Sequence, residues 1–425
     1  MEDRNTVRAR RPAPMNATAL IVTVCFAQFI GQMGSTTFNG LLPVLRDEWG
    51  LTNTEGGLLS GIIFGVYALS VLVLVTATDR FQARRIYLIG VFASTVSHLG
   101  MAYVAHDFAT GMIFRAIAGF GWAGTYMVGL RVLSDELEGR IRSRGVGFHA
   151  AAMGVGGSLS FFLAGEIDRW LGWEAAFLVS AAGTGGAFLV ALLLFPRREP
   201  TPSGTNPLAD FGHVFRNRSA MAYIACYGVH TWEMFAVRSW AVAFLTFAAM
   251  RSGLGPEYWL APTVVAMLME LLGTASSIAG NEFAIRIGRQ RWVLLTMSVC
   301  MALACATGFI SAWGYWAAAA LCILYNMAIY ADSAALTAGT VGASEPERRG
   351  ATLAVHALSG YGMGFVGAVV LGGILDLMGG ESVLAWGIGF AHIALVMALG
   401  PLALLFLKPA DLAGDRAIRA GAKRT

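Results

Sequence analysis

Ionisable side chains inside long apolar stretches are the residues of this sequence best suited to chemistry. His230 and Glu233 lie three residues apart near the middle of the apolar stretch 219–248, and residues at that spacing are neighbours on a helix. A carboxylate and an imidazole held together away from water can take up and release a proton. We therefore predict a proton-binding site at His230 and Glu233, with a static ion pair as the alternative. Asp332 and Glu270, in two further apolar stretches, are candidates for a second protonatable group.

Arg115 is the most conspicuous cation within an apolar stretch. Placing an arginine at the centre of a bilayer costs about 3 kcal/mol on insertion scales, so its side chain must face water or a partner. Because a guanidinium binds a carboxylate through two parallel hydrogen bonds, Arg115 predicts an anionic substrate, with a structural salt bridge as the alternative. Arg238 lies five residues after Glu233 on a different helix face, where it would serve an outer gate or pair with a neighbouring helix.

Polar residues recur at helical spacing in four of the apolar stretches and mark a face turned away from lipid. Polar contacts between helices, worth about 1 kcal/mol each, are the alternative explanation. The four stripes are Gln28, Gln32, Ser35 and Asn39; Arg115, Gly119, Trp122 and Tyr126; Cys226, His230, Glu233 and Trp240; and Asn326, Tyr330, Ser333 and Thr337. The remaining buried histidines, His98, His149, His356 and His392, are expected to be packing residues.

Several kinds of chemistry have no counterpart in the sequence. The two lysines, Lys408 and Lys423, follow no glycine-rich turn, so the chain has no phosphate-binding loop of the Walker type. The five cysteines lie in apolar stretches without CxxC or Cys/His metal spacing. HExxH, a DxxD metal cluster and a Ser/His/Asp grouping are also missing. We therefore expect no catalytic residues, no metal and no cofactor, and energy drawn from an ion gradient or a partner.

The elements that position these residues are membrane-spanning helices. Of the 425 residues, 56% are apolar and 13% charged, with a mean hydropathy of +0.62, whereas soluble proteins carry about 25% charged residues. Since a span needs roughly 20 apolar residues, the sequence predicts an all-α integral membrane protein with twelve spans. The predicted spans are 18–44, 55–78, 86–105, 110–133, 145–168, 172–195, 219–248, 259–283, 292–312, 314–341, 350–375 and 383–407.

The arginines indicate the orientation of the spans. Every second connection and both termini are rich in arginine, while the opposite connections hold only Arg46, Arg169 and Arg251. Because cytoplasmic loops carry the excess of positive charge, we predict a multi-pass protein of the cell (inner) membrane with both termini cytoplasmic.

The sequence divides into two similar halves. Arg80 and Arg286, Arg144 and Arg349, and His149 and His356 are each separated by about 206 residues, which is the pattern of parallel repeats. The predicted parts are a cytoplasmic tail (1–17), a six-helix bundle (18–197), a cytoplasmic linker (198–218), a second six-helix bundle (219–408) and a second cytoplasmic tail (409–425). Glycines four residues apart, Gly57, Gly61 and Gly65 in the second span and Gly360 and Gly364 in the eleventh, permit close helix packing.

Two motifs resemble signatures of the major facilitator superfamily. The sequence DRFQARR at 79–85 resembles the loop 2–3 motif GxxxDRxGRR, with Val75 and Gln82 in place of its glycines. Arg115, Gly119 and Gly121 resemble the RxxxGxG motif of the fourth span, whereas the Gly-Pro pair found in the fifth span of many antiporters is missing from 154–165. The chain also resembles, more loosely, cyanate and anion permeases of that superfamily. The resemblance implies two six-helix bundles that rock about a central cavity lined by the first and fourth spans of each half.

The candidate residues fall into three sets, and the resemblance implies that the first of them points into the central cavity. The substrate-binding set is Gln28, Gln32, Asn39, Arg115, Trp122, Tyr126, His230, Trp240, Asn326 and Tyr330; the proton-coupling set is Glu233, His230 and Asp332. Asp79, Arg80, Arg84 and Arg85 form a cytoplasmic gate. In that gate Asp79 pairs with one of the arginines or faces the N-terminus of the eleventh helix near Gly350, and the alternative is that these charges are only a helix cap and positive-inside residues.

The sequence therefore predicts a secondary active transporter that works by alternating access and is coupled to protons. A small organic or inorganic anion is the favoured substrate, and the alternative is proton-driven efflux of amphipathic cations, favoured by Trp122, Tyr126 and Trp240 beside Glu233. A membrane enzyme or a receptor is disfavoured because no catalytic grouping and no large soluble extension is present. The expected partners are the solute, protons and the lipid bilayer, with no nucleic acid and a monomeric chain.

Overall fold

The computed structural model describes residues 16–200, 211–254, 260–410 and 412. Within these ranges it has 12 helical spans long and apolar enough to cross a membrane. The predicted tails and the middle of the predicted linker lie largely outside the described residues, including Arg4, Arg8, Arg10 and Arg11.

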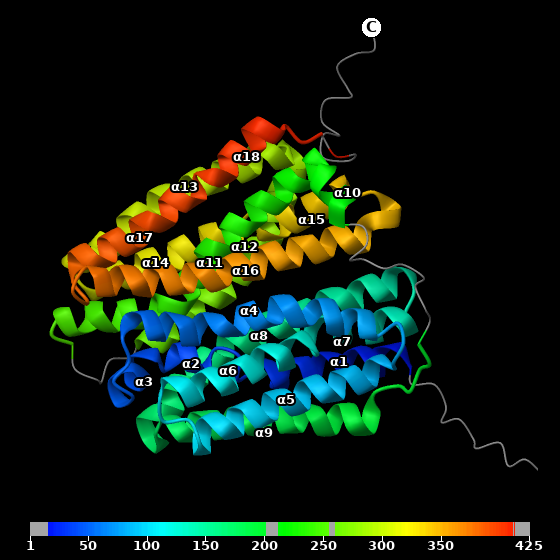
Figure 1. Cartoon of the computed structure of the whole chain (residues 1–425), viewed down its shortest axis with the longest axis horizontal. Coiled ribbons are helices and arrows are strands. Elements are labelled where there is room, and N and C mark those ends of the chain that lie inside the picture. Colours follow the sequence, from blue (N-terminus) through cyan, green and yellow to red (C-terminus); the bar gives the residue numbers. More distant parts are fainter. Residues whose placement is uncertain (1–15, 201–210, 255–259, 411, 413–425) are drawn as a thin grey trace, which may run out of the picture.

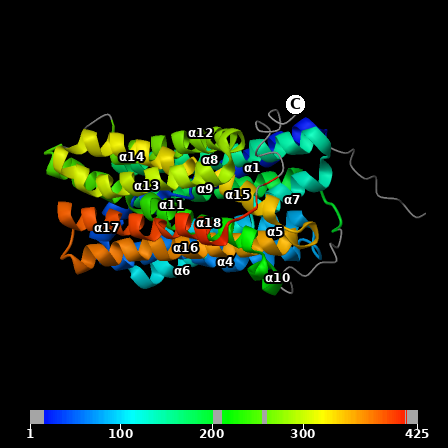
Figure 2. The ribbon, with the colours of Figure 1, turned by 90° about the horizontal axis from the view of Figure 1, so that it is seen from above.

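The spans form two bundles that lie one above the other in Figure 1, with their helices along a common long axis, as Figure 2 also shows. The first bundle consists of α1 (Ala17–Gln32), α2 (Thr37–Gly40), α3 (Leu42–Glu48), α4 (Asn53–Ala77), α5 (Ala83–Tyr103), α6 (Phe108–Ala123), α7 (Tyr126–Glu136), α8 (Gly139–Leu171) and α9 (Trp173–Leu194). The short α10 (Phe211–Arg216) precedes the second bundle. That bundle consists of α11 (Arg218–Arg251), α12 (Pro262–Ile287), α13 (Arg289–Ile310), α14 (Tyr315–Tyr330), α15 (Ser333–Ala343), α16 (Arg349–Leu377), α17 (Val383–Met397) and α18 (Leu399–Leu407).

Both bundles place the start of their first helix and the end of their last helix at the same end of the molecule, where α10 also lies (Figure 1). We call this the linker end, and the other the opposite end. Each observed span agrees within a few residues with a predicted one, and the tight turn expected near Trp313 is made by Gly314, whose φ is 100°. A positive φ of this size is the conformation that glycine adopts most readily.

Four spans are interrupted within the bundle, which hydropathy did not predict. The breaks fall at 33–36 between α1 and α2, at 124–125 between α6 and α7, at 331–332 between α14 and α15, and at 398 between α17 and α18. At the second break, a Cβ on Gly124 would lie 2.8 Å from the Cα of Gly90, so the broken helix lies directly against the backbone of α5. Three of these interrupted spans are the first and fourth of the first bundle and the fourth of the second. Those three carry predicted polar stripes.

Polar caps fix the ends of several spans at the opposite end. Thr52 and Glu55 form a reciprocal capping box at the start of α4, which satisfies two amide groups that the helix itself leaves free. Asp107 caps α6 in the same manner, and hydrogen bonds from the hydroxyl and the amide of Thr110 lower the pKa of the Asp107 carboxyl.

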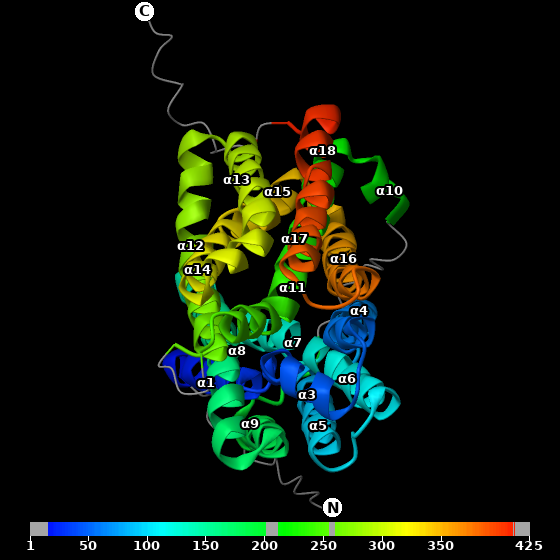
Figure 3. The ribbon, with the colours of Figure 1, turned by 90° about the vertical axis from the view of Figure 1, so that its left-hand side faces the viewer.

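The two bundles meet along α4 and α16, which run antiparallel and lie next to each other across the interface in Figure 3. A Cβ on Gly57 would lie 2.6 Å from the carbonyl oxygen of Ala368, and one on Gly61 would lie 2.9 Å from that of Phe365. The spaced glycines therefore bring the two backbones into direct contact. Nearer the linker end, the rings of Tyr67 and Tyr361 pack with centroids 4.2 Å apart.

Charged and polar side chains join the bundles at the opposite end. Asp376, in the last turn of α16, accepts hydrogen bonds from the amides of Asn53 and Thr54 at 3.0 and 2.7 Å and from both of their side chains. The carboxylate thus caps the N-terminus of α4 across the interface. Arg46 reaches the carboxylate of Glu381 at 2.6 Å beside it. These contacts hold the opposite end closed.

Candidate functional site

A central cavity of about 450 Å³ lies between the two bundles at mid-depth and extends toward the linker end. Its walls come from both bundles, chiefly from three of the interrupted spans and from α8 and α12, with Ile63 and Phe64 of α4 and Arg238 of α11. The polar residues that line it are Gln32, Ser35, Thr36, Asn39, Arg115, Trp122, Tyr126, Arg238, Glu270, Thr274, Ser277, Tyr330 and Ser333. This volume matches that of pockets for drug-sized or smaller organic molecules.

Arg238 and Glu270 form an ion pair on the second-bundle wall of this cavity. The Arg238 guanidinium lies 3.0 Å from the Glu270 carboxylate, which also accepts a hydrogen bond from the Tyr330 hydroxyl at 2.8 Å. Arg238 therefore pairs with a neighbouring helix, one of its two predicted roles. The positive charge of Arg238 is thus compensated by the carboxylate of Glu270 within the protein.

Arg115 lies on the first-bundle wall, and its charge is not balanced by an acid. Its Nε and Nη2 atoms donate to the carbonyl oxygens of Leu59 and Ser60 at 2.9 and 3.3 Å, and its guanidinium lies 4.8 Å from the ring centre of Phe38. Among the residues that the structure describes, no carboxylate pairs with Arg115. The charged residues lining the central cavity, two arginines and one glutamate, therefore carry a net charge of +1.

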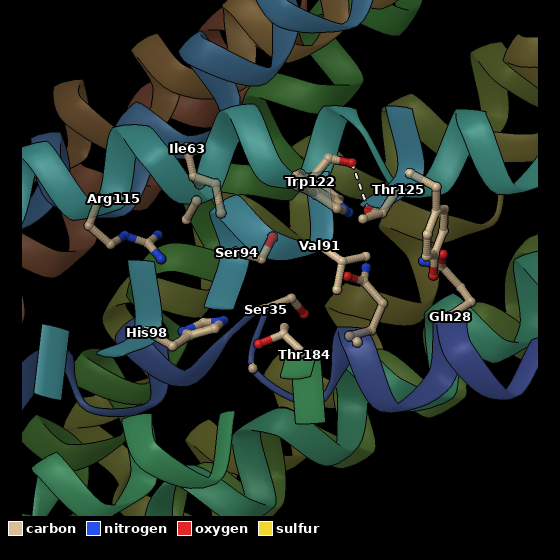
Figure 4. Close-up of a pocket in the computed structure, with 15 residues that line it drawn as sticks. Gln28, Ser35, Ile63, Val91, Ser94, His98, Arg115, Trp122, Thr125 and Thr184 are labelled. Carbon is tan, nitrogen blue, oxygen red and sulfur yellow. Dashed lines mark hydrogen bonds between the residues drawn. The ribbon is translucent and has the colours of Figure 1, made fainter. Parts of the chain in front are cut away.

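A second, smaller cavity of about 30 Å³ lies inside the first bundle, behind Arg115. We call it the side cavity. Its wall includes Gln28, Ser94, His98, Thr125 and Thr184 (Figure 4), and it shares Gln32, Ser35, Ile63, Arg115 and Trp122 with the central cavity. His98, expected to be a packing residue, thus lies on the wall of this cavity.

A cluster of fully buried ionisable residues lies in the second bundle. The Nδ1 atom of His230 is 2.9 Å from the Oδ1 atom of Asp332, and the Tyr325 hydroxyl donates to Glu233 at 2.7 Å. All of these side chains are at most 1% exposed. His230, Glu233 and Asp332 form what we call the acid–histidine cluster, and none of the three lines the two cavities described above.

Two features of the acid–histidine cluster bear on proton transfer. The Nε2 atom of His230 and the Oε2 atom of Glu233 have no hydrogen-bond partner among the described residues, although such atoms in a protein interior are normally paired. Asp332 lies at the break between α14 and α15 and precedes Ser333, which lines the central cavity. The cluster therefore touches the wall of the cavity through the backbone of this break.

Seven of the ten predicted substrate-binding residues line a cavity: Gln28, Gln32, Asn39, Arg115, Trp122, Tyr126 and Tyr330. The other three lie in packed surroundings. Trp240 donates from its indole to the carbonyl of Ala368 at 2.9 Å, Asn326 donates to that of Met269 at 2.6 Å, and His230 belongs to the acid–histidine cluster.

Two of the four predicted gate residues, Asp79 and Arg84, have contacts within the first bundle, whereas Arg80 and Arg85 are exposed. Asp79 lies 3.5 Å from Arg131 of α7. Arg84 donates to the carbonyl oxygens of Ala191 and Leu192 at the end of α9. Arg131 as a partner of Asp79 was not predicted, because it lies on another span, far from Asp79 in the sequence.

Sequence reasoning also missed the wall that α8 contributes. Gly147, Ala150, Ala151 and Gly154 line the central cavity, and their spacing places them on one helix face. They were not singled out because small residues alone carry no chemical signal. Small side chains on this helix face nevertheless leave the space between the helices that forms the central cavity.

The fold and the cavity define a membrane protein of two similar helix bundles with a solute-sized cavity between them. Residues 24–368 match the family model of the Major Facilitator Superfamily, so the chain belongs to that family. The fold is similar to that of the nucleoside transporter NupG, with 14% identity, a TM-score of 0.71 and coverage of 93% of this chain and 100% of that one. It is also similar to an inward-facing bacterial homologue of the human lysosomal transporter Spinster, with 16% identity, a TM-score of 0.67 and coverage of 92% of this chain and 95% of that one.

Curated relatives are transporters by name. The chain is 25% identical over 276 residues to a probable 4-methylmuconolactone transporter of Cupriavidus pinatubonensis, covering 62% of this chain and 61% of that protein. It is 26% identical over 194 residues to a probable L-galactonate transporter of Escherichia coli, covering 45% and 42%. The chain thus matches less than two thirds of the length of these relatives.

Proposed function

We propose that this protein transports a small organic anion through the central cavity by alternating access. The observation that carries the proposal is Arg115, a buried cation on the cavity wall without a carboxylate partner in the described chain. A buried charge is costly unless an opposite charge compensates it, and a guanidinium binds a carboxylate through paired hydrogen bonds. An anionic solute would supply the missing charge while it occupies the cavity.

The surroundings of Arg115 suit such a solute. Gln32, Asn39 and Tyr126 line the same cavity with hydrogen-bonding groups, and Trp122 offers an apolar face. One relative in the comparisons is named for L-galactonate, which is a carboxylate. We infer a solute with one carboxylate and a mixed polar and apolar body.

Uptake into proteoliposomes tests this proposal directly. Radiolabelled monocarboxylates of increasing size are the probes, and saturable uptake of at least one of them is expected. In the Arg115→Gln variant we expect uptake to fall at least tenfold, because the partner charge is lost, whereas Arg115→Lys should retain part of it through a single hydrogen bond. Unchanged uptake in Arg115→Gln would contradict the proposal.

We further propose that the acid–histidine cluster couples this transport to protons. The unpaired atoms of Glu233 and His230 are available to a proton, and Asp332 lies at the break that shapes the cavity wall. Protonation would change the charge at the break between α14 and α15 and so favour one arrangement of the bundles over the other.

The pH dependence of uptake tests the coupling. In Glu233→Gln, uptake driven by a pH gradient should disappear while exchange of the solute at equal pH on both sides continues. Thr231→Val is a suitable control, because the Thr231 hydroxyl donates only to the carbonyl oxygens of Tyr227 and Gly228 in the same helix. Full pH coupling in Glu233→Gln would exclude the assignment.

The arrangement of the molecule in the membrane follows from the same proposal. The arginine-rich linker end would face the cytoplasm of the cell, with the protein in the inner membrane as a monomer. The closed opposite end and the cavity near the linker end then correspond to a state open toward the cytoplasm. Asp79 and Arg84 would close the linker end in the alternate state.

Efflux of an amphipathic cation is the second candidate. It is favoured by the aromatic rings of Phe64, Trp122 and Tyr126 on the cavity wall, together with the carboxylate of Glu270. Cation efflux predicts that a lipophilic cation, such as tetraphenylphosphonium, raises the unfolding midpoint of the purified protein. It also predicts that this effect is lost in Glu270→Gln and kept in Arg115→Gln, which is opposite to the pattern for an anion.

A further inference from the structure

The wall of the side cavity includes buried polar atoms that lack a hydrogen-bond partner among the described residues. Gln28 Oε1, Ser35 Oγ, His98 Nδ1 and Trp122 Nε1 are all buried and without a hydrogen-bond partner among the described residues, and all four residues line this cavity. Gln28 and His98 are only 2% and 6% exposed. Since buried polar atoms are normally paired, four such atoms around one space indicate an occupant that hydrogen-bonds to them.

The charge around the side cavity selects the kind of occupant. Arg115 lines it, and no aspartate or glutamate is found among the described residues of its wall. The guanidinium uses its Nε and one Nη2 hydrogen for backbone carbonyls, so the N–H groups of Nη1 remain for another acceptor. A cation would be repelled by Arg115, and a neutral molecule would leave the charge of Arg115 uncompensated.

The remaining groups on the wall are mostly able to donate. The indole N–H of Trp122 is a donor only, and the hydroxyls of Ser35 and Ser94 can turn toward an acceptor. Figure 4 shows Arg115, Ser94 and His98 around one side of the space, with Ser35 facing it from the first span. The Gln28 amide can present its NH₂ group after a turn of 180°. Donors on several sides of a small space are suited to a compact anion.

The volume limits the size of this anion. About 30 Å³ exceeds the 10–15 Å³ that holds a single water, and it leaves room for one halide ion or the carboxylate end of a larger molecule. We propose that the side cavity is a binding site for one compact monovalent anionic group, held by Arg115, Ser35, Trp122 and His98.

Occupation of this site has a consequence for the central cavity. Arg115 belongs to both walls, so an anion in the side cavity compensates the charge that the central cavity otherwise presents. The shared residues Ser35 and Trp122 lie between the two spaces. The anionic group is therefore either a free inorganic ion or the carboxylate end of a solute whose body lies in the central cavity.

Bromide is the probe for the site, because it binds where halides bind and can be located by anomalous scattering. The purified full-length protein in detergent is titrated from sodium sulfate into sodium bromide at constant ionic strength, and its thermal unfolding midpoint is followed. We expect a saturable rise of several degrees. Crystals grown in bromide should show one anomalous peak between Arg115, Ser35 and His98.

Variants separate this site from binding elsewhere. His98→Phe removes the unpaired nitrogen and narrows the space, and Ser35→Ala removes one donor; each should weaken the bromide effect at least fivefold. Ser158→Ala is the matched control: Ser158 is a buried serine of the same bundle, lines neither cavity and donates to the carbonyl of Gly154. A bromide effect that is equal in all variants, or an anomalous peak outside the side cavity, would overturn the proposal, as would a titration without saturation.

Formate, titrated in the same manner, distinguishes the two sources of the anionic group. A saturable rise that competes with bromide identifies a site that accepts a carboxylate, while a response to bromide alone identifies a site for a free inorganic ion. Both outcomes support an anion site. Because neither measurement involves transport, a failure here is distinct from a failure of the proposed organic-anion transport, which rests on uptake.

Discussion

Arg115 and Arg238 both line the central cavity, one from each bundle, and have different surroundings. Arg238 has the carboxylate of Glu270 at 3.0 Å, whereas Arg115 has carbonyl oxygens and an aromatic ring. An ion pair with an internal partner contributes to the folded structure, whereas under the proposed function Arg115 would take its counter-charge from the solute. The two residues of the same type therefore have different expected effects when substituted.

Removal of the Glu270 charge is expected to lower stability. Glu270→Gln leaves the largely buried Arg238 without its counter-ion, which costs about 3 kcal/mol for a buried pair, and the thermal unfolding midpoint of the purified protein should fall by several degrees. Glu282→Gln, an exposed position on the same helix α12, should leave the midpoint unchanged.

A double variant tests whether the loss comes from the unpaired arginine. Arg238→Gln combined with Glu270→Gln removes both charges and should recover much of the midpoint, with a coupling energy of about 1–3 kcal/mol. Additive losses in the double variant would show that the pair is not coupled.

At the residue scale, the sequence predicted which side chains are unusual better than it predicted their partners. Arg115, Glu233 and Asp332 stand out in the sequence because a charged residue within a membrane-spanning helix is energetically costly and marks a candidate functional site. The partners of two of them lie on other helices. Asp332 pairs with His230 of α11, and Glu233 accepts a hydrogen bond from Tyr325 of α14. Helical spacing gives the relative positions of side chains on one helix only. It could not predict contacts between helices that are far apart in the sequence.

The contact between α4 and α16 depends on residues that have no side chain. Gly57 lies so close to the backbone of α16 that a methyl group would meet the Ala368 carbonyl at 2.6 Å, whereas at Gly65 the same group would meet the Phe365 ring at 3.4 Å. Backbone cannot move aside as a flexible side chain can. Gly57 and Gly65, on the same face of α4, should therefore differ in how well they tolerate an added methyl group.

We expect Gly57→Ala to destabilise the protein by about 1–3 kcal/mol through overpacking, seen as a lower thermal unfolding midpoint. Gly65→Ala is the matched control on the same face and should change the midpoint little, since the Phe365 ring needs to shift by only a few tenths of an ångström. Equal midpoints for the two variants would mean that α16 adapts to a methyl group at either position.

At the element scale, the sequence predicted the twelve spans and the tight turn at Gly314 but not the interruptions. A hydropathy window averages over about 19 residues, and segments such as 331–332 are too short to lower that average. The interruptions change backbone hydrogen bonding rather than composition. They became visible only with the structure, although three of them fall on spans already marked by polar stripes.

For the whole molecule, Asp376 and the N-terminus of α4 form the lock of the opposite end. The carboxylate accepts four hydrogen bonds from Asn53 and Thr54 across the interface. Under the proposed alternating access this end opens in the alternate state, so each of these bonds would break in every cycle. The lock therefore belongs to one of the two states only.

A disulfide across this lock should stop transport. Thr54→Cys combined with Asp376→Cys places two thiols where the native side chains are in contact, and oxidation should reduce uptake into proteoliposomes at least tenfold, with recovery after a reducing agent. Each single cysteine variant, oxidised in the same way, serves as the control for the five native cysteines. Uptake that continues at full rate in the cross-linked protein would mean that the opposite end does not open during transport.

The spatial separation of the two bundles also has a genetic consequence. Every helix of one bundle precedes Arg198 in the sequence, and every helix of the other follows Phe211. We expect a coding sequence divided between these positions to yield two folding units, one for each bundle. The glycine-containing face of α4, with Gly57, Gly61 and Gly65, and the face of α16 that it contacts would be surfaces through which separately synthesised polypeptides reassemble in the membrane. The molecule can be regarded as a permanent heterodimer whose two subunits are joined by one stretch of chain.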